Sequence, residues 1–175
     1  MKDLGELKFF LGIEVSRSQK GILMCQSKYT VELVSEIGLS GCKPASTPIE
    51  FNYKLTSLEF DKYFNHNSEL DKELTDSSKY QILVRRLLYL TITRPDIAFV
   101  VQVLSPFMHS PKKSHMEVAL RVVRHIKGTA GLGLFMPSSR CSNLVSFCDS
   151  GWGSCVETRK SVTGHIVNFG NAVIS

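Results

Sequence analysis

The sequence predicts an α+β fold in which a β-hairpin is followed by a helical region and then by a β-meander. Residues 7–15 and 22–26 are rich in β-capable apolar side chains, and the polar turn between them is typical of a hairpin. Beyond position 77 the apolar residues recur at helical spacing, and beyond Pro137 they return to short strand-like runs. Hydrophobic residues make up 43% of the 175-residue chain, which is enough to form a core.

The first helix is expected at residues 28–38. Apolar side chains at positions 29, 33, 34 and 37 share one helical face, and Gly38 suits the C-terminal end. Pro44 and Pro48 then favour an extended chain.

Three more helices are expected in the second half, at residues 78–90, 95–109 and 111–127. Pro95 suits the first turn of a helix, and Asp96 beside it favours the positive end of the helix dipole. Gly128 is expected to end the last helix.

The helix expected at residues 111–127 has the clearest two-sided pattern. Its apolar side, expected to face the core, holds Met116, Val118, Ala119, Val122, Val123 and Ile126. Its charged side holds Lys113, Glu117, Arg121, Arg124 and Lys127. The basic residues form either a solvated surface or a face that neutralises phosphates without reading bases.

Charge is unevenly distributed along the chain, whose net charge is +5. Residues 50–76 carry seven acids and three lysines, a net charge of −4, whereas residues 77–127 carry nine Lys or Arg and two acids, a net charge of +7. We interpret residues 50–76 as an acidic linker without regular elements, next to a basic segment with a polyanionic partner. The alternative is that both are ordinary solvated surfaces.

The short apolar runs of the C-terminal part predict a meander of strands at residues 143–148, 161–169 and 172–175. Strands of this size need another element to cover one face before they form a stable sheet.

The cysteines argue against both disulfides and a metal site. Their number is odd, and the N-terminus lacks the apolar run of a secretory signal, so we expect an intracellular protein, cytoplasmic or nuclear, that is not secreted. Cys141, Cys148 and Cys155 recur every seventh residue, but structural zinc ligands usually come in closely spaced pairs. We therefore expect free or buried thiols. The longest apolar run is too short to span a bilayer, so no membrane partner is expected.

A series of motifs, in the right order along nearly the whole chain, resembles the copia-type LTR retrotransposon Pol polyprotein. The sequence MKDLGELKFFLGIEV at positions 1–15 is similar to the segment that follows the polymerase palm. The strongest match is LLYLTITRPDIA at positions 87–98. The other matching runs are QSKY at 26–29, CKPASTP at 42–48, His115, RVVR at 121–124, KGT at 127–129, CDSGW at 148–152, TRKS at 158–161 and Gly164.

The resemblance implies a division of the chain. Residues 1–49 would be the end of the reverse transcriptase palm with a thumb hairpin and helix, and residues 50–76 the acidic linker. Residues 77–139 would be a helical thumb or connection region, and residues 140–175 the first strands of an incomplete RNase H-like domain. A template–primer duplex of RNA or DNA, held weakly and without sequence preference, is the partner that this implies, and no small-molecule substrate is expected.

The resemblance also implies that the isolated chain is not an enzyme. Polymerase metals are held by paired carboxylates, and the chain contains no Asp-Asp pair. Asp149 matches the first RNase H carboxylate, whereas the other members of that cluster match positions beyond Ser175. A single carboxylate binds Mg²⁺ weakly, so we expect no cofactor on the chain alone and Mg²⁺ only in an intact parent polyprotein.

Three residues depart from the family pattern or from good helix chemistry. Gly151 stands where many relatives carry an acidic residue, and Arg85 stands where they usually have Gly, which predicts crowding of a close contact. Pro106 falls inside the helix expected at residues 95–109 and removes a backbone donor there. These changes favour a truncated, decayed retroelement segment. Two alternatives stay open: a non-catalytic nucleic-acid-binding module, and a part of a polyprotein that is active only with its missing flanks or with a separate chain.

Overall fold

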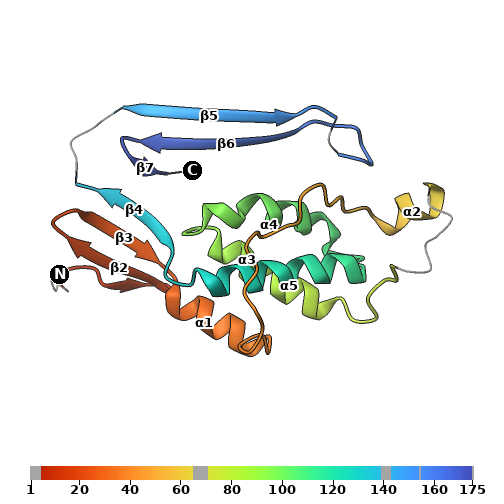
Figure 1. Ribbon diagram of the computed structural model, residues 1–175, viewed down its shortest axis with the longest axis horizontal. Coiled ribbons are helices and arrows are strands. Elements are labelled where there is room, and N and C mark those ends of the chain that lie inside the picture. The colour runs from red at the N-terminus through yellow and green to blue at the C-terminus, as the bar shows by residue number, and fades with distance from the viewer. Residues whose placement is uncertain (1–4, 65–70, 139–142, 154, 175) are drawn as a thin grey trace.

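The computed structural model describes residues 5–64, 71–138, 143–153 and 155–174. It contains helices and antiparallel sheets, an arrangement compatible with the expected α+β class. Figure 1 shows α1, α3, α4 and α5 together, α2 apart from them at the right, the N-terminal strands beside the helices and the C-terminal strands extended above them. The assignment of these parts to thumb, connection and RNase H-like regions stays a prediction.

The first sheet has the order β1-β2-β3-β4, and its members are β1 (Phe9–Phe10), β2 (Ile13–Ser18), β3 (Gly21–Cys25) and β4 (Gly133–Pro137). The expected hairpin is present between β2 and β3, with Ser18 opposite Gly21. The continuous strand expected at residues 7–15 was wrong, because Leu11 and Gly12 both adopt positive φ, 46° and 79°, and turn the chain between β1 and β2. The hydroxyl of Tyr89 donates a hydrogen bond to the Leu11 carbonyl and holds this turn.

β4 follows the last helix and pairs antiparallel with β3. Two glycines let these strands approach closely: a Cβ at Gly21 would collide with the Met136 carbonyl, and one at Gly133 with the Met24 carbonyl. The first and second halves of the chain are therefore joined by main-chain hydrogen bonds as well as by side-chain packing.

The helical core is built from α1 (Ser27–Glu36), α3 (Ser78–Leu90), α4 (Ala98–Leu104) and α5 (Lys113–Gly128). The helices predicted at residues 28–38 and 78–90 are confirmed, and Gly38 has the positive φ of a C-terminal cap, 76°. The last helix begins at Lys113 rather than at residue 111. Its predicted apolar side is confirmed, because Met116 packs against the core and the following residues are buried in it: Val118, Ala119, Val122, Val123 and Ile126.

The single helix expected at residues 95–109 was wrong. The segment consists of a 3-10 turn, η1 (Pro95–Ile97), then α4 (Ala98–Leu104), then a second 3-10 turn, η2 (Ser105–Met108). Pro106 therefore lies in the first turn of η2 and not inside a continuous helix. The hydroxyl and the amide of Ser105 both donate to the Val101 carbonyl at the end of α4, the hydroxyl at 2.8 Å.

Arg85 does not crowd a packing contact, contrary to the expectation from the sequence. It lies exposed on α3, while the buried face of that helix is formed by residues such as Val84 and Leu87. A glycine is therefore not needed at this position for the helix to pack.

The linker interpretation of residues 50–76 was wrong in part. The segment contains α2 (Leu58–Phe64), and Leu55 and Leu74 pack against the helical core. Glu73 forms a β-bridge with Lys112, and the Leu74 amide donates to the Pro111 carbonyl at 2.8 Å. Its described residues are therefore partly built into the domain.

The predicted meander is confirmed as a sheet of order β5-β6-β7, formed by β5 (Leu144–Gly151), β6 (Val162–Phe169) and β7 (Ala172–Val173). Every residue of β5 is exposed, including Phe147, which is 60% accessible. Within the described part of the chain, β5 is covered by no other element, whereas β7 lies against β4 and its Ala172 is buried.

Candidate functional site

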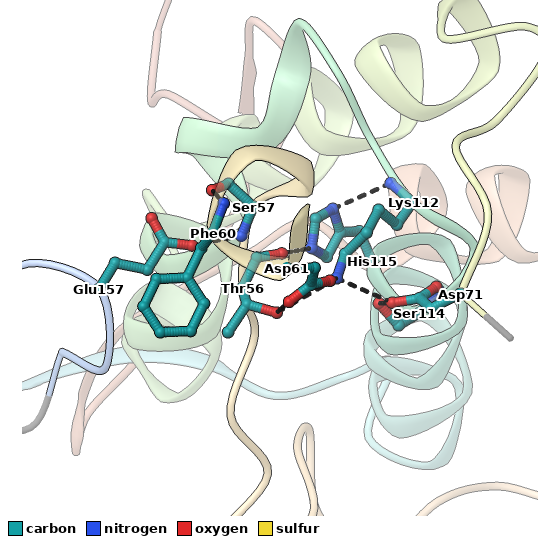
Figure 2. Close-up of polar contacts among 9 residues, drawn as sticks. All are labelled: Thr56, Ser57, Phe60, Asp61, Asp71, Lys112, Ser114, His115 and Glu157. Atoms are coloured by element: carbon teal, nitrogen blue, oxygen red, sulfur yellow. Dashed lines mark hydrogen bonds and ion pairs between the residues drawn. The ribbon is translucent and has the colours of Figure 1, made fainter. Parts of the chain in front are cut away.

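The most highly organised polar site lies at the start of α5, where Figure 2 shows side chains from three segments converging. We call it the Lys112 cluster; its members are Thr56, Asp61, Asp71, Lys112, Ser114 and His115. The Lys112 side chain is only 3% exposed. Its ammonium bonds to the Asp61 carboxylate, lies 3.0 Å from a carboxylate oxygen of Asp71 and donates to the Thr56 hydroxyl at 3.2 Å.

The charges in the cluster stabilise one another. Burial alone would lower the pKa of Lys112, but hydrogen bonds from its ammonium to Asp61 and Asp71 outweigh burial and raise it. Burial would raise the pKa of Asp71, yet the hydroxyl and amide of Ser114 and the Lys112 ammonium hold it below its ordinary value. Lys112 is thus kept charged and is not a nucleophile.

His115 is fully buried, and both of its ring nitrogens are used. The Lys112 amide donates to Nδ1 at 3.0 Å, so the proton of the neutral ring is on Nε2, which faces the Thr56 carbonyl at 3.0 Å. Its ring stacks on Phe107 with centroids 4.0 Å apart. Burial lowers the pKa of His115 to about 4, although the hydrogen bond to the Thr56 carbonyl acts in the opposite direction. This arrangement holds residues 56–61 against α5 and leaves no base available for a substrate.

A second buried network lies at the other end of α5. Arg94 is 1% exposed, and its guanidinium forms a paired contact with the Asp96 carboxylate at 2.7 and 2.8 Å. It also donates to the carbonyl and hydroxyl of Thr129, at 3.0 and 2.8 Å. Asp96 in turn lies 3.4 Å from His125, whose other ring nitrogen faces the Ala45 carbonyl. Burial would raise the pKa of Asp96, but the Arg94 contact outweighs it and lowers the pKa.

Residues of the motifs in the sequence therefore bind one another. Arg94 and Asp96 come from the strongest motif, and Thr129 comes from the KGT run. The Thr93 hydroxyl donates to the side-chain carbonyl of Gln26 at 2.8 Å, which ties the QSKY run to the same region. Arg94, Thr93 and Gln26 are buried, so these polar side chains are used within the chain and are not open to a ligand.

The predicted nucleic-acid-binding residues all lie on α5, but two of them are used within the chain. The Lys127 ammonium donates to the carbonyls of Ser40 at 2.5 Å and Cys42 at 2.6 Å. Arg121 pairs with Glu50 at 2.7 Å and donates to the Thr47 carbonyl at 3.2 Å. Residues 39–42 and 47–50 are therefore held on the basic side of α5. This is the side that we predicted from the sequence to contact phosphates.

The other two predicted residues have more freedom. Lys113 is exposed at the start of α5, and Arg124 is half-buried. Neither side chain forms an ion pair within the described residues. Arg124 lines an open hollow of about 160 Å³ together with Glu50, Tyr53, Glu117, Val118 and Arg121.

Asp149, the predicted RNase H carboxylate, lies on β5 opposite Gly164 and is exposed. Cys148 beside it and Cys155 in the following loop carry free thiols, and Cys141 lies outside the described residues. No group of three or more His, Cys, Asp or Glu side chains suited to a metal ion occurs among the residues described.

Sequence reasoning missed the Lys112 cluster. The only signal was the opposite charge of two neighbouring segments, which we interpreted as a linker beside a binding surface. The pairs formed by Lys112 with Asp61 and Asp71, and by Arg121 with Glu50, show that the acidic segment neutralises part of the basic one.

The similarity to known proteins extends over the whole chain. Residues 1–51 match the family model described as reverse transcriptase (RNA-dependent DNA polymerase). An uncharacterized mitochondrial protein of Arabidopsis thaliana, AtMg00810, is 35% identical over 175 residues, which cover the whole chain and 68% of that protein. The retrovirus-related Pol polyproteins from transposon RE1 of Arabidopsis thaliana and transposon TNT 1-94 of Nicotiana tabacum are 33% and 30% identical, again over the whole chain. No solved structure matches.

The chain belongs to the family of copia-type retrotransposon Pol polyproteins, as a reverse transcriptase-like segment of them. It spans only 11% of the RE1 polyprotein and 13% of the TNT 1-94 polyprotein. Among the described residues, no helix combines the length and the apolar character needed to cross a bilayer.

Replacing Lys112 by Met should lower the free energy of unfolding by about 3 kcal/mol, because it leaves the Asp61 carboxylate buried without its ammonium partner. The same change at the exposed neighbour Lys113 should shift it by less than about 0.5 kcal/mol. Urea unfolding of the two variants measures the difference. Equal destabilisation of both would show that the buried ion pair does not matter for stability.

The pKa of His115 predicts a specific pH dependence of stability. Between pH 6.5 and about 4 the unfolded chain binds a proton on this ring that the folded chain excludes, so stability decreases as the pH falls through that range. The stabilisation from Asp71 and Asp96, whose pKa values are lowered from 3.8, is lost only at lower pH.

Urea unfolding at several pH values in this range tests the assignment. Replacing His115 by Gln should flatten the decrease, whereas replacing the exposed His109 by Gln should leave it unchanged. The same pH slope in the parent and the His115→Gln variant would contradict the prediction.

Proposed function

We propose that this chain is a non-catalytic connecting segment of a copia-type RNA-directed DNA polymerase and RNase H polyprotein, with weak and sequence-independent affinity for nucleic acid. In this proposal the helices form a thumb or connection region, and β5 to β7 are the first strands of an incomplete RNase H-like domain. The observation that carries it is the use of motif residues in contacts within the chain, where the buried Arg94 guanidinium binds Asp96 and Thr129.

The nucleic-acid contact is proposed for the basic side of α5. Lys113 and Arg124 are the residues best placed to meet a phosphate, because neither is paired with an acid in the described part of the chain. Arg121 would have to exchange the Glu50 carboxylate for a phosphate, and Lys127 would have to leave its carbonyls. These competing contacts support affinity in the non-specific range, roughly 10⁻⁴ to 10⁻⁶ M at physiological salt.

A second candidate function is a part of an intact polyprotein that becomes active with its flanks. The small share of the RE1 polyprotein that the chain spans favours it. In that case Asp149 would join carboxylates supplied by other segments and would hold Mg²⁺ with them. The exposure of Asp149 on an uncovered strand is compatible with such an addition.

The isolated chain should neither extend a primed template nor cut the RNA of a hybrid when Mg²⁺ or Mn²⁺ is supplied. The physical reason is that Asp149 alone cannot hold the metal pair that phosphoryl transfer uses. Primer-extension and hybrid-cleavage assays measure both activities. Metal-dependent cleavage that disappears in the Asp149→Asn variant would contradict the proposal that the RNase H-like part is non-catalytic.

Replacing Arg121 and Arg124 by Gln should flatten the salt dependence of duplex binding, because the slope of log affinity against log salt falls by about one for each phosphate that the protein no longer neutralises. Fluorescence anisotropy of a labelled duplex measures the slope, and circular dichroism checks that helix content is unchanged. The matched control is a Lys79→Gln, Arg85→Gln double variant, which removes the same amount of positive charge from exposed positions on α3. Identical slopes in the parent and the α5 variant would mean that this face is merely solvated.

A further inference from the structure

The hairpin formed by β5 and β6 ends in a tip that presents the chain's single tryptophan to solvent. Trp152 follows β5 directly and is 91% exposed. An indole ring is among the side chains whose burial stabilises a protein most. The Trp152 ring takes no part in the core and lies in the turn that follows β5.

Hydrogen bonds close this turn and fix its shape. The Gly153 amide donates to the Ser161 hydroxyl at 3.3 Å, the Cys155 amide to the Lys160 carbonyl at 3.2 Å, and the Arg159 amide to the Cys155 carbonyl at 2.9 Å. Gly153 and Arg159 both have positive φ, 57° and 55°, and a Cβ at Gly153 would lie 3.7 Å from the Arg159 carbonyl oxygen. Trp152 is therefore held next to the returning segment that carries Arg159 and Lys160.

The charge of the tip is positive on its exposed side. Arg159 and Lys160 are exposed, and neither forms an ion pair with a described residue. The acidic residue of the tip, Glu157, accepts a hydrogen bond from the Ser57 amide, and Figure 2 shows its side chain turned toward the first turn of α2. The carboxylate is thus directed inward, and the indole ring and two cations remain at the surface.

We propose that this tip binds single-stranded nucleic acid, with a base stacked on Trp152 and the adjoining phosphates on Arg159 and Lys160. An aromatic ring beside two cations matches the alternation of base and phosphate along a strand. In a duplex the flat faces of the bases are covered by their neighbours, so a protruding indole finds an open base only on an unpaired strand. The inference takes its partner class from the proposed function but uses a surface separate from α5.

Because Trp152 is the chain's single tryptophan, its fluorescence reports on the tip alone. The experiment titrates the full chain with an oligothymidylate strand while the anisotropy of a label on that strand reports binding anywhere on the protein. We expect the tryptophan to be quenched with the same midpoint as the anisotropy change. A duplex of equal length should quench it less.

Variants of the tip should separate stacking from charge. Replacing Trp152 by Ala should weaken binding of the strand about tenfold by anisotropy, whereas Trp152→Phe should retain most of the affinity. The Arg159→Gln, Lys160→Gln double variant keeps the fluorophore and should lower the salt slope by about 1.4. Its matched control is Arg17→Gln, Lys20→Gln at the β2–β3 hairpin, which removes two exposed cations and should leave the quenching midpoint unchanged.

The outcomes distinguish this inference from the proposed function. Binding of the strand without any change in Trp152 fluorescence would overturn the tip as a site and leave the α5 proposal intact. Quenching that requires the tip but is equal for strand and duplex would overturn stacking. Quenching by anionic lipid vesicles and not by the strand would assign the tip to a membrane surface instead. If neither the strand nor the duplex binds, both proposals fall.

Discussion

The structure depends on neutralising the positive charges of the side chains that are buried at the two ends of α5. The apolar stripe of this helix forms a large part of the core, and burying it also takes Lys112 and Arg94 out of water. A buried ammonium or guanidinium is tolerated only with carboxylates and hydrogen bonds around it. Asp61 and Asp71 supply them at one end, and Asp96 with Thr129 at the other. Segments far apart in the sequence are brought to α5 for this reason.

Several polar residues that carry the family resemblance are buried, although most residues of the matching runs are exposed or half-buried. Arg94, Thr93 and His115 are buried and use their polar atoms within the chain. The proposed nucleic-acid contacts use side chains that the fold leaves at the surface, such as Lys113 on α5 or the cations of the β5–β6 tip.

The ion pairs within the chain also bear on the proposed binding of nucleic acid. The pairing of Arg121 with Glu50 gives the basic side of α5 an anionic partner already, and a phosphate would have to displace it. The exposed pair is worth little for stability, typically less than about 1 kcal/mol, so such displacement is energetically accessible. The buried Lys112 pairs differ, because breaking them leaves a charge in the interior.

The sequence by itself determined the local elements. Helical spacing and a terminal glycine located α1, unbroken helical spacing located α3, and alternation of turns with apolar runs located the hairpin of β2 and β3 and the later meander. These features depend on side chains within a few residues of one another, which is why a pattern reveals them. The motifs likewise identified the family, because they are read directly from the order of residues.

Only the tertiary structure decided what the charged residues do. A sequence shows that residues 50–76 are acidic, but not that Asp61 and Asp71 lie against Lys112 or that Glu50 meets Arg121. The tertiary structure also places Arg85 at the surface and Pro106 in a 3-10 turn. Charge partners are chosen by which segments the packing of α5 brings together. Lys112 and Arg121 are separated from these acidic partners by 40 residues and more, where no local period carries a signal.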